Sequence, residues 1–239
     1  MPSVRLWVPE SDYDSKAVCC IAKKIVAFYG RNDITIQFAD KQGFNQAIHP
    51  KNKDGLKKAV NNYLNNNDLV IFLLDSDGTQ SQAQRRREKN SLVNRIEEVV
   101  NSFEGRVKFF RMVEELEAWL LIDCLGICCY FTNNADNRDN QQWIKFANKR
   151  QHGQTDLIAE AESGGNGAKE YLEELSKEIL IKKNPDFKDK PRNLEERKYR
   201  ESQSSKIAEY IEINNQTLKK NKSLLEFAKC LEQLADSRQ

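Results

Sequence analysis

The sequence predicts an α/β fold in which a mostly parallel sheet is flanked by helices and followed by a helical C-terminal region. Two observations lead to this prediction. Short apolar, β-prone runs alternate with amphipathic helical patterns up to about residue 128, and such alternation favours a parallel sheet covered on both faces. Beyond that point the chain has polar connections, Asn-rich turns and three or four helical patterns without a clear strand. We therefore expect an α/β core at 1–128 and a helical region at 129–239.

The individual elements follow from periodicity. Residues 4–8, 33–40, 69–74 and 105–113 are predicted strands, and residues 14–30, 54–66, 87–103 and 114–127 are predicted helices. Gly30 ends the first helix, because glycine is favoured just after a helical C-terminus. Trp119 continues the apolar face of the helix at 114–127 with Leu116 and Leu120, so we expect it in the core.

Composition sets broad limits. The chain has 239 residues, of which 39% are hydrophobic and 31% charged, with a net charge of +2. No apolar run approaches the ~20 residues that cross a bilayer, and acidic residues appear as early as Glu10, Asp12 and Asp14, unlike a secretory leader. We expect a cytoplasmic protein.

Six cysteines raise the question of zinc. The spacing of Cys124, Cys128 and Cys129 lacks the second ligand pair that a structural site needs, and the chain contains only His49 and His152 as histidines. The cysteines are therefore interpreted as small hydrophobic core residues.

Acidic residues follow three of the four predicted strands. Because parallel strands end at one edge of a sheet, these acids should converge there and raise each other's pKa unless a cation neutralises them. Hard divalent cations such as Mg²⁺ or Mn²⁺ prefer such oxygen ligands. The acids are Glu10, Asp14, Asp75, Asp77, Glu114, Glu115 and Glu117.

Each acidic motif also has a simpler interpretation. Asp75-Ser-Asp77 could be a turn, because aspartate side chains accept hydrogen bonds from the nearby backbone. Glu10 and Asp14, like the glutamates at 114–117, could be first-turn acids or caps of a helix. Their coincidence at one predicted edge favours a metal site.

The same motifs resemble the Toprim domain of topoisomerases, primases and the overcoming-lysogenization-defect nucleases. The resemblance lies in "PESDYDSKAV" and "LLDSDG". The segment "EELEAWLLID" resembles the Glu-x-Glu-Ala-Trp signature of a small Toprim-like branch that is often encoded beside an AAA- or ABC-type ATPase, and the tail "YRESQSSKIAEYI" is similar to its C-terminus. Ser11 stands where the first motif usually has glycine.

The resemblance implies a metal-dependent nuclease that acts with a partner ATPase in antiviral defence. Two cations about 4 Å apart would promote phosphodiester hydrolysis. Asp75, Asp77 and Glu117 would be ligands, Asp14 and Glu115 would complete the metal shell, Glu10 would bind metal or act as general base, and Lys206 would stabilise the phosphorane-like charge. The sequence leaves open which of Glu114, Glu115 and Glu117 is the ligand, and whether DNA or RNA is cut.

Basic residues gather in two places. Arg85, Arg86, Arg87 and Lys89 directly follow the acidic loop, where they would bind a phosphate backbone. A second basic stretch lies at 182–200 around a proline-containing connection. Both could also be solvated surface.

Two other functions stay open. "LLDSDGT" also matches the first motif of haloacid dehalogenase phosphatases, with Asp75 as nucleophile and Asp77 as acid/base, although no later strand is predicted to carry the remaining acids. Alternatively, the domain is a non-catalytic module that binds an ATPase.

Overall fold

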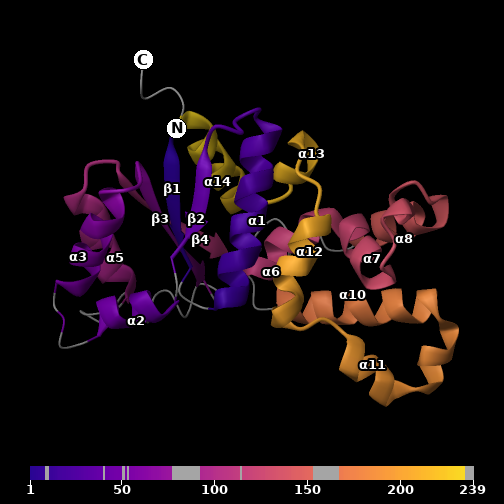
Figure 1. The fold of residues 1–239 in the computed structure, drawn as a ribbon. Coiled ribbons are helices and arrows are strands. Elements are labelled where there is room, and N and C mark those ends of the chain that lie inside the picture. Colours follow the sequence, from indigo (N-terminus) through magenta and orange to yellow (C-terminus); the bar gives the residue numbers. More distant parts are fainter. Residues whose placement is uncertain are drawn as a thin grey trace.

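The computed structural model describes residues 1–8, 11–39, 41–49, 52, 54–76, 92–113, 115–152 and 167–234. Within these ranges the predicted α/β class is confirmed: a four-stranded parallel sheet is flanked by helices and followed by a helical C-terminal region (Figure 1).

The sheet has the strand order β2-β1-β3-β4, and each neighbouring pair is parallel. Its strands are β1 (Ser3–Trp7), β2 (Thr35–Phe38), β3 (Leu69–Ser76) and β4 (Val107–Val113). Val4 lies opposite Ile36 on one side and Leu69 on the other. All four carboxyl ends therefore lie at the same edge, which is the lower edge in Figure 1.

Alternating side chains of the strands enter two separate cores. Leu6, Ile71 and Leu73 belong to the larger one, which they share with α1 (Asp12–Phe28), α6 (Glu115–Leu120) and the C-terminal helices. Trp7 and Phe72 belong to the smaller one, which is covered by α3 (Gly55–Leu64) and α5 (Leu92–Ser102). Burial on both faces explains why the strands are continuous apolar runs.

Helix α1 begins and ends at identifiable residues. Ser11 is its N-cap, and its Oγ accepts a hydrogen bond from the backbone N–H of Asp14 at 3.0 Å. Gly30 follows its C-terminus with φ +70°, a left-handed conformation that glycine adopts without strain, and its N–H donates to the Ala27 carbonyl at 3.0 Å. The expected stop at Gly30 is confirmed, while the helix spans 12–28 rather than 14–30.

The predicted helix at 114–127 is wrong as a single element. It divides into α6, a 3-10 turn η1 (Leu121–Asp123) and α7 (Cys124–Thr132). The break occurs because Asp123 leaves the helical conformation (φ −134°, ψ 78°), and its side chain accepts from the Gly126 N–H at 3.0 Å as the N-cap of α7. Helix α2 (Lys41–Ile48) was not predicted at all.

Other boundaries moved by a few residues. Strand β2 is shorter than the predicted 33–40, β3 extends two residues beyond 74, and α5 covers 92–102 of the predicted 87–103, whose residues 87–91 lie outside the described part.

The C-terminal region contains more elements than expected and no strand among its described residues. They are η2 (Ala135–Arg138), α8 (Gln141–His152), α10 (Ala168–Lys183), η3 (Pro185–Asp189), α11 (Pro191–Arg197), η4 (Glu201–Gln203), α12 (Ser204–Tyr210), α13 (Asn215–Leu218) and α14 (Lys222–Gln233).

These C-terminal helices pack directly on the α/β core. Helices α12 and α14 contact α1, and their apolar side chains belong to the same cluster as those of β1 and β3. Trp119 is fully buried as predicted, stacks on Phe227 of α14 at a centroid distance of 5.4 Å, and donates from Nε1 to Ser223 Oγ at 2.9 Å. Residues 1–128 and 129–239 thus share one core, and residue 128 lies inside α7.

Among the described residues, no helix is both long enough and apolar enough to cross a membrane.

Candidate metal-binding site at the carboxyl edge of the sheet

The structure describes part of the predicted acidic site. The backbone of Asp75 lies at the second-to-last position of β3, opposite Met112 of β4, and Glu115 begins α6 directly after β4. The side chains of these two residues lie outside the described part, as do Glu10, Asp77 and Glu114 entirely. Two of the predicted ligands, Asp14 and Glu117, are described with their side chains.

Glu117 is a buried carboxylate held by a tyrosine from the C-terminal region. It lies in α6 with 5% of its surface exposed. The hydroxyl of Tyr199, a fully buried residue just before η4, donates to Glu117 Oε1 at 2.6 Å. This hydroxyl also lies 2.9 Å from Ser204 Oγ, which in turn donates to the Glu201 carbonyl at 2.6 Å. The hydrogen bond from Tyr199 therefore orients the carboxylate.

The surroundings of Glu117 disfavour its charged form. Burial raises the pKa of this carboxyl above its ordinary value, and the hydrogen bond from Tyr199 only partly opposes that effect. The negative charge of Asp14 raises the pKa further, while the positive charge of Lys169 at the start of α10 lowers it. Lys169 itself pairs with Glu201. Asp14 and Lys169 are therefore close enough to Glu117 for their charges to act on it.

Asp14 is positioned by the N-terminus of α1. Its Oδ2 accepts from Ser11 Oγ at 2.6 Å, while the same Oγ accepts from the Asp14 N–H. Ser11 has an extended backbone (φ −151°, ψ 159°) that suits any residue. The serine in place of the usual glycine therefore creates no backbone strain and supplies the side-chain cap that a glycine lacks.

The described residues fit a divalent cation as carboxylate donors but do not complete a site. They contain no group of three or more His, Cys, Asp or Glu side chains that could hold a metal. Glu117 and Asp14 supply oxygen donors of the kind that Mg²⁺ and Mn²⁺ prefer. A cation beside Glu117 would compensate the cost of its burial, which Tyr199 alone does not. Further ligands would have to come from residues 10, 75, 77 and 115.

Sequence reasoning missed three residues that contact or influence Glu117: Tyr199, Ser204 and Lys169. The segment "YRESQSSKIAEYI" was compared only as a whole, and Lys206 was the residue singled out in it. Lys206 is an exposed residue of α12, whereas Lys169 is the lysine whose charge reaches Glu117. The available signal was a single tyrosine within a stretch of charged residues. An aromatic side chain in such a stretch indicates that this position is buried against the rest of the protein.

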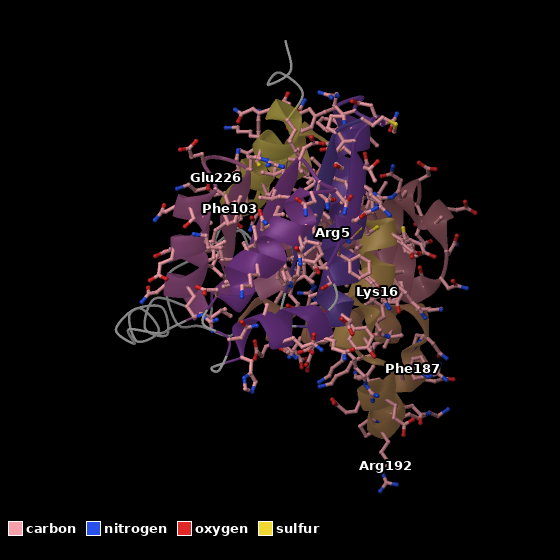
Figure 2. All side chains as sticks on the ribbon, turned by 60° about the vertical axis from the view of Figure 1, so that its left-hand side comes forward. Arg5, Lys16, Phe103, Phe187, Arg192 and Glu226 are labelled. Atoms are coloured by element: carbon pink, nitrogen blue, oxygen red, sulfur yellow. The ribbon has the colours of Figure 1, made fainter. Side chains whose placement is uncertain are left out.

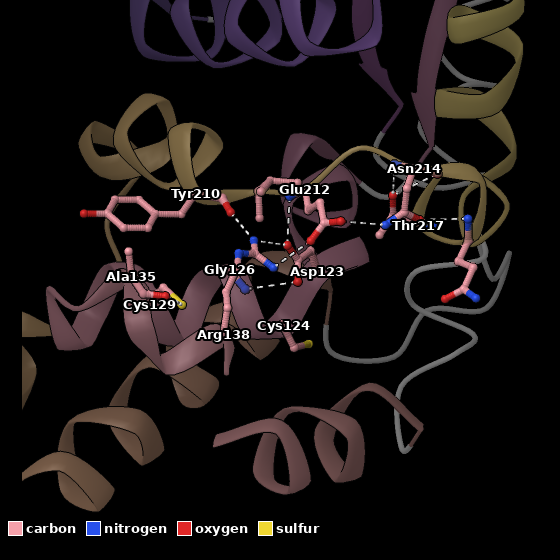
Figure 3. Close-up of polar contacts among 12 residues, drawn as sticks. Asp123, Cys124, Gly126, Cys129, Ala135, Arg138, Tyr210, Glu212, Asn214 and Thr217 are labelled. Atoms are coloured by element: carbon pink, nitrogen blue, oxygen red, sulfur yellow. Dashed lines mark hydrogen bonds and ion pairs between the residues drawn. The ribbon is translucent and has the colours of Figure 1, made fainter. Parts of the chain in front are cut away.

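The C-terminal end of α12 and the segment that follows it are held by polar contacts. At its C-terminal end, Lys24 of α1 donates to the carbonyls of Glu209 and Ile211 at 2.6 and 2.7 Å. The following segment is anchored by the polar cluster in Figure 3, in which Asp123 accepts from Arg138 Nη2 at 2.7 Å and from the Glu212 N–H at 2.8 Å.

Two other predictions concern residues away from this cluster. All six cysteines are free, and five of them are buried, as expected of small core residues. Burial raises the pKa of Cys124 to about 12, so that its thiol stays protonated. The basic residues Arg85, Arg86, Arg87 and Lys89 lie outside the described part.

No protein-family model, curated protein or solved structure matches this chain. The resemblance to Toprim nucleases therefore rests on the sequence motifs.

Proposed function

We propose that this protein is a divalent-metal-dependent nuclease that hydrolyses phosphodiester bonds of DNA or RNA at the carboxyl edge of its sheet. The observation that carries the proposal is the position of Glu117. This buried carboxylate lies in α6, the helix that follows β4, is close enough to Asp14 in the first turn of α1 for the two charges to interact, and is oriented by a hydrogen bond from Tyr199. Burial of this carboxyl raises its pKa and disfavours its charged form, and groups perturbed in this way are concentrated at functional sites, which supports a role as a ligand.

The residues have distinct roles in this proposal. Asp75, Asp77 and Glu117 would hold Mg²⁺ or Mn²⁺, and Asp14 and Glu115 would complete the shell. When bound, a pair of such ions would activate water and stabilise the leaving oxygen.

The remaining groups would handle protons and the substrate. Glu10 would take a proton from the attacking water, and Tyr199 would keep Glu117 oriented through its 2.6 Å hydrogen bond. The arginines at 85–87 would bind the phosphate backbone. Lys169 and Lys206 are the cations proposed to offset negative charge, Lys169 because its charge acts on Glu117 and Lys206 because of the family resemblance.

The motif resemblance further supports a partner ATPase of the AAA or ABC type and a role in antiviral defence. In that setting the ATPase would license cleavage. Co-purification with the product of an adjacent ATPase reading frame would test this part of the proposal separately from the chemistry.

The phosphatase alternative has weaker support. It requires acidic residues from a strand late in the chain, and the described residues after Val113 contain no strand. The non-catalytic alternative is not favoured by Ser11, because this serine caps α1 and positions Asp14 instead of distorting the motif.

The test is cleavage of single- and double-stranded DNA and RNA by the purified protein, alone and with its ATPase. We expect Mg²⁺ or Mn²⁺ to support cleavage, EDTA to abolish it, and Ca²⁺ to support it poorly because it polarises bound water less. Glu117→Gln and Asp75→Asn should remove activity, whereas Glu226→Gln, an exposed glutamate of α14 labelled in Figure 2, should not. Turnover of a simple phosphomonoester without nucleic acid cleavage would instead support the phosphatase.

A further inference from the structure

The segment between α10 and α12 forms a projecting basic arm, defined here as residues 182–200. It consists of the end of α10, η3 and α11. In Figure 1 it extends below α10, on the same side of the molecule as the carboxyl edge of the sheet. Figure 2 shows Arg192 at its tip, beyond the rest of the described chain at that end.

Charge is strongly concentrated on this arm. It carries eight basic and four acidic side chains, a net charge of +4, compared with +2 for the whole protein. The remainder of the chain is therefore net negative. Such a local excess of cations produces a positive potential that attracts polyanions.

At the base of the arm, Glu195 of α11 and Glu173 of α10 form ion pairs with lysines. Glu195 pairs with Lys177 at 2.7 Å and with Lys198 at 3.2 Å, and Glu173 pairs with Lys198 at 2.5 Å. These ion pairs fasten α11 to α10. The other three acidic residues of the arm, Asp186, Asp189 and Glu196, are exposed, so its exposed surface carries both signs of charge with an excess of cations.

Three cations of the arm are exposed and form no ion pair among the described residues. Lys188, Lys190 and Arg192 are all exposed and occupy η3 and the start of α11. Aromatic rings fix two more, because the Arg197 guanidinium lies 5.2 Å from the centroid of Phe187 and Lys182 Nζ lies 5.1 Å from that of Trp143. Two of the arm's cations are thus held against aromatic rings, while Lys188, Lys190 and Arg192 are exposed.

We infer that the basic arm is a docking surface for the phosphate backbone of a nucleic acid duplex beside the carboxyl edge of the sheet. The inference rests on the proposed function for its position, because a duplex seated on the arm would extend toward Glu117. Phosphate contacts supply most sequence-independent affinity and require unpaired Lys and Arg side chains. Exposed cations favour a polyanionic partner. An apolar protein partner would need an apolar surface on the arm, and the exposed residues described above are charged.

The test is the salt dependence of duplex binding in EDTA, where cleavage is absent. We would measure binding of short DNA and RNA duplexes over a series of KCl concentrations for the wild type and for the triple variant Lys188→Gln, Lys190→Gln, Arg192→Gln. The matched control is Lys219→Gln, Lys222→Gln, Lys229→Gln, which removes the same charge from exposed positions on α14 and on the turn before it, at the opposite end of the molecule in Figure 1.

We expect the arm variant to bind more weakly and to reduce the slope of log K against log salt by about three units, roughly one for each lost phosphate contact. The control should leave the slope nearly unchanged. An equal fall in both variants would show only an effect of net charge and overturn the inference, as would an unchanged slope in the arm variant or absence of duplex binding by the wild type. Loss of binding to a partner protein with an unchanged slope would assign the arm to that protein instead.

Failure of this inference can be distinguished from failure of the proposed function. Duplex binding through the arm without metal-dependent cleavage would leave the arm in place and refute the nuclease. Metal-dependent cleavage, together with an unchanged slope of log K against log salt in the arm variant, would support the nuclease and refute the role of the arm.

Discussion

Replacing Tyr199 by phenylalanine removes one hydroxyl from the centre of the candidate site. Two hydroxyl protons serve three contacts there: Tyr199 with Glu117, Tyr199 with Ser204, and Ser204 with the Glu201 carbonyl. When Glu117 is ionised it can only accept, so the tyrosine proton must go to it. Ser204 retains its own acceptor after the substitution. The loss is therefore chiefly one hydrogen bond to a buried charge.

A hydrogen bond to a charged group contributes about 1.5–3 kcal/mol, and the buried carboxylate that remains would be more poorly solvated than before. We expect Tyr199→Phe to lower the free energy of unfolding by about 2–3 kcal/mol at neutral pH, which corresponds to a fall in Tm of roughly 5–10 °C for a protein of this size. Mn²⁺ affinity should also fall, by about 10–100-fold, because the ligand loses its orienting partner.

The matched control is Tyr171→Phe. Tyr171 donates from its hydroxyl to the Arg150 carbonyl at 3.1 Å, a bond between neutral groups away from Glu117. It should cost about 1 kcal/mol and leave Mn²⁺ affinity unchanged. Urea denaturation and calorimetric Mn²⁺ titration measure both quantities. If Tyr199→Phe loses no more stability than Tyr171→Phe and binds Mn²⁺ as the wild type does, the positioning role of Tyr199 is refuted.

Three further outcomes are expected. Glu117→Gln should raise Tm in EDTA, and more at pH 8 than at pH 4. The raised pKa of Glu117 makes the folded wild type lose stability as the pH rises above 4.5, the ordinary pKa of a glutamate. Thermal melts across pH measure this, and an equal or opposite effect would contradict it. Gly126→Ala should destabilise the protein by about 1–3 kcal/mol, since its Cβ would lie 2.6 Å from the Tyr210 carbonyl and 2.8 Å from Asp123 Oδ2 in the cluster of Figure 3, and wild-type stability in urea would disprove that account. Replacing the three arginines at 85–87 by alanine should lower the salt slope of nucleic acid binding by up to about three units with unchanged Mn²⁺ affinity, whereas a solvated surface would show the wild-type slope.

The sequence predicted those parts of the fold that depend on local periodicity. The buried strand at Leu69 and the stop of α1 at Gly30 follow from apolar runs and glycine chemistry, and both were located within two residues. The break at Asp123 was not predicted, because an aspartate inside an apolar helical pattern gives no sign that it will cap a new helix. Helix α2 was missed because its few apolar residues lie among amides.

The candidate site was only partly predictable for a similar reason. Glu117 could be proposed because it follows a strand directly. Its partner Tyr199 lies 82 residues away in sequence, in a region whose packing on α6 no local pattern encodes. Contacts of this kind depend on tertiary structure, and so does the shift in the pKa of Glu117.

Calorimetric titration of Mn²⁺ into the wild type and into Glu117→Gln, with Glu226→Gln as the control, tests the central claim most directly. If the carboxyl edge of the sheet is a metal site, the wild type and the control should bind Mn²⁺ with the same affinity, and Glu117→Gln should bind it at least about tenfold more weakly while remaining folded. Absence of Mn²⁺ binding by the wild type, or equal binding by all three proteins, would contradict a metal site that includes Glu117.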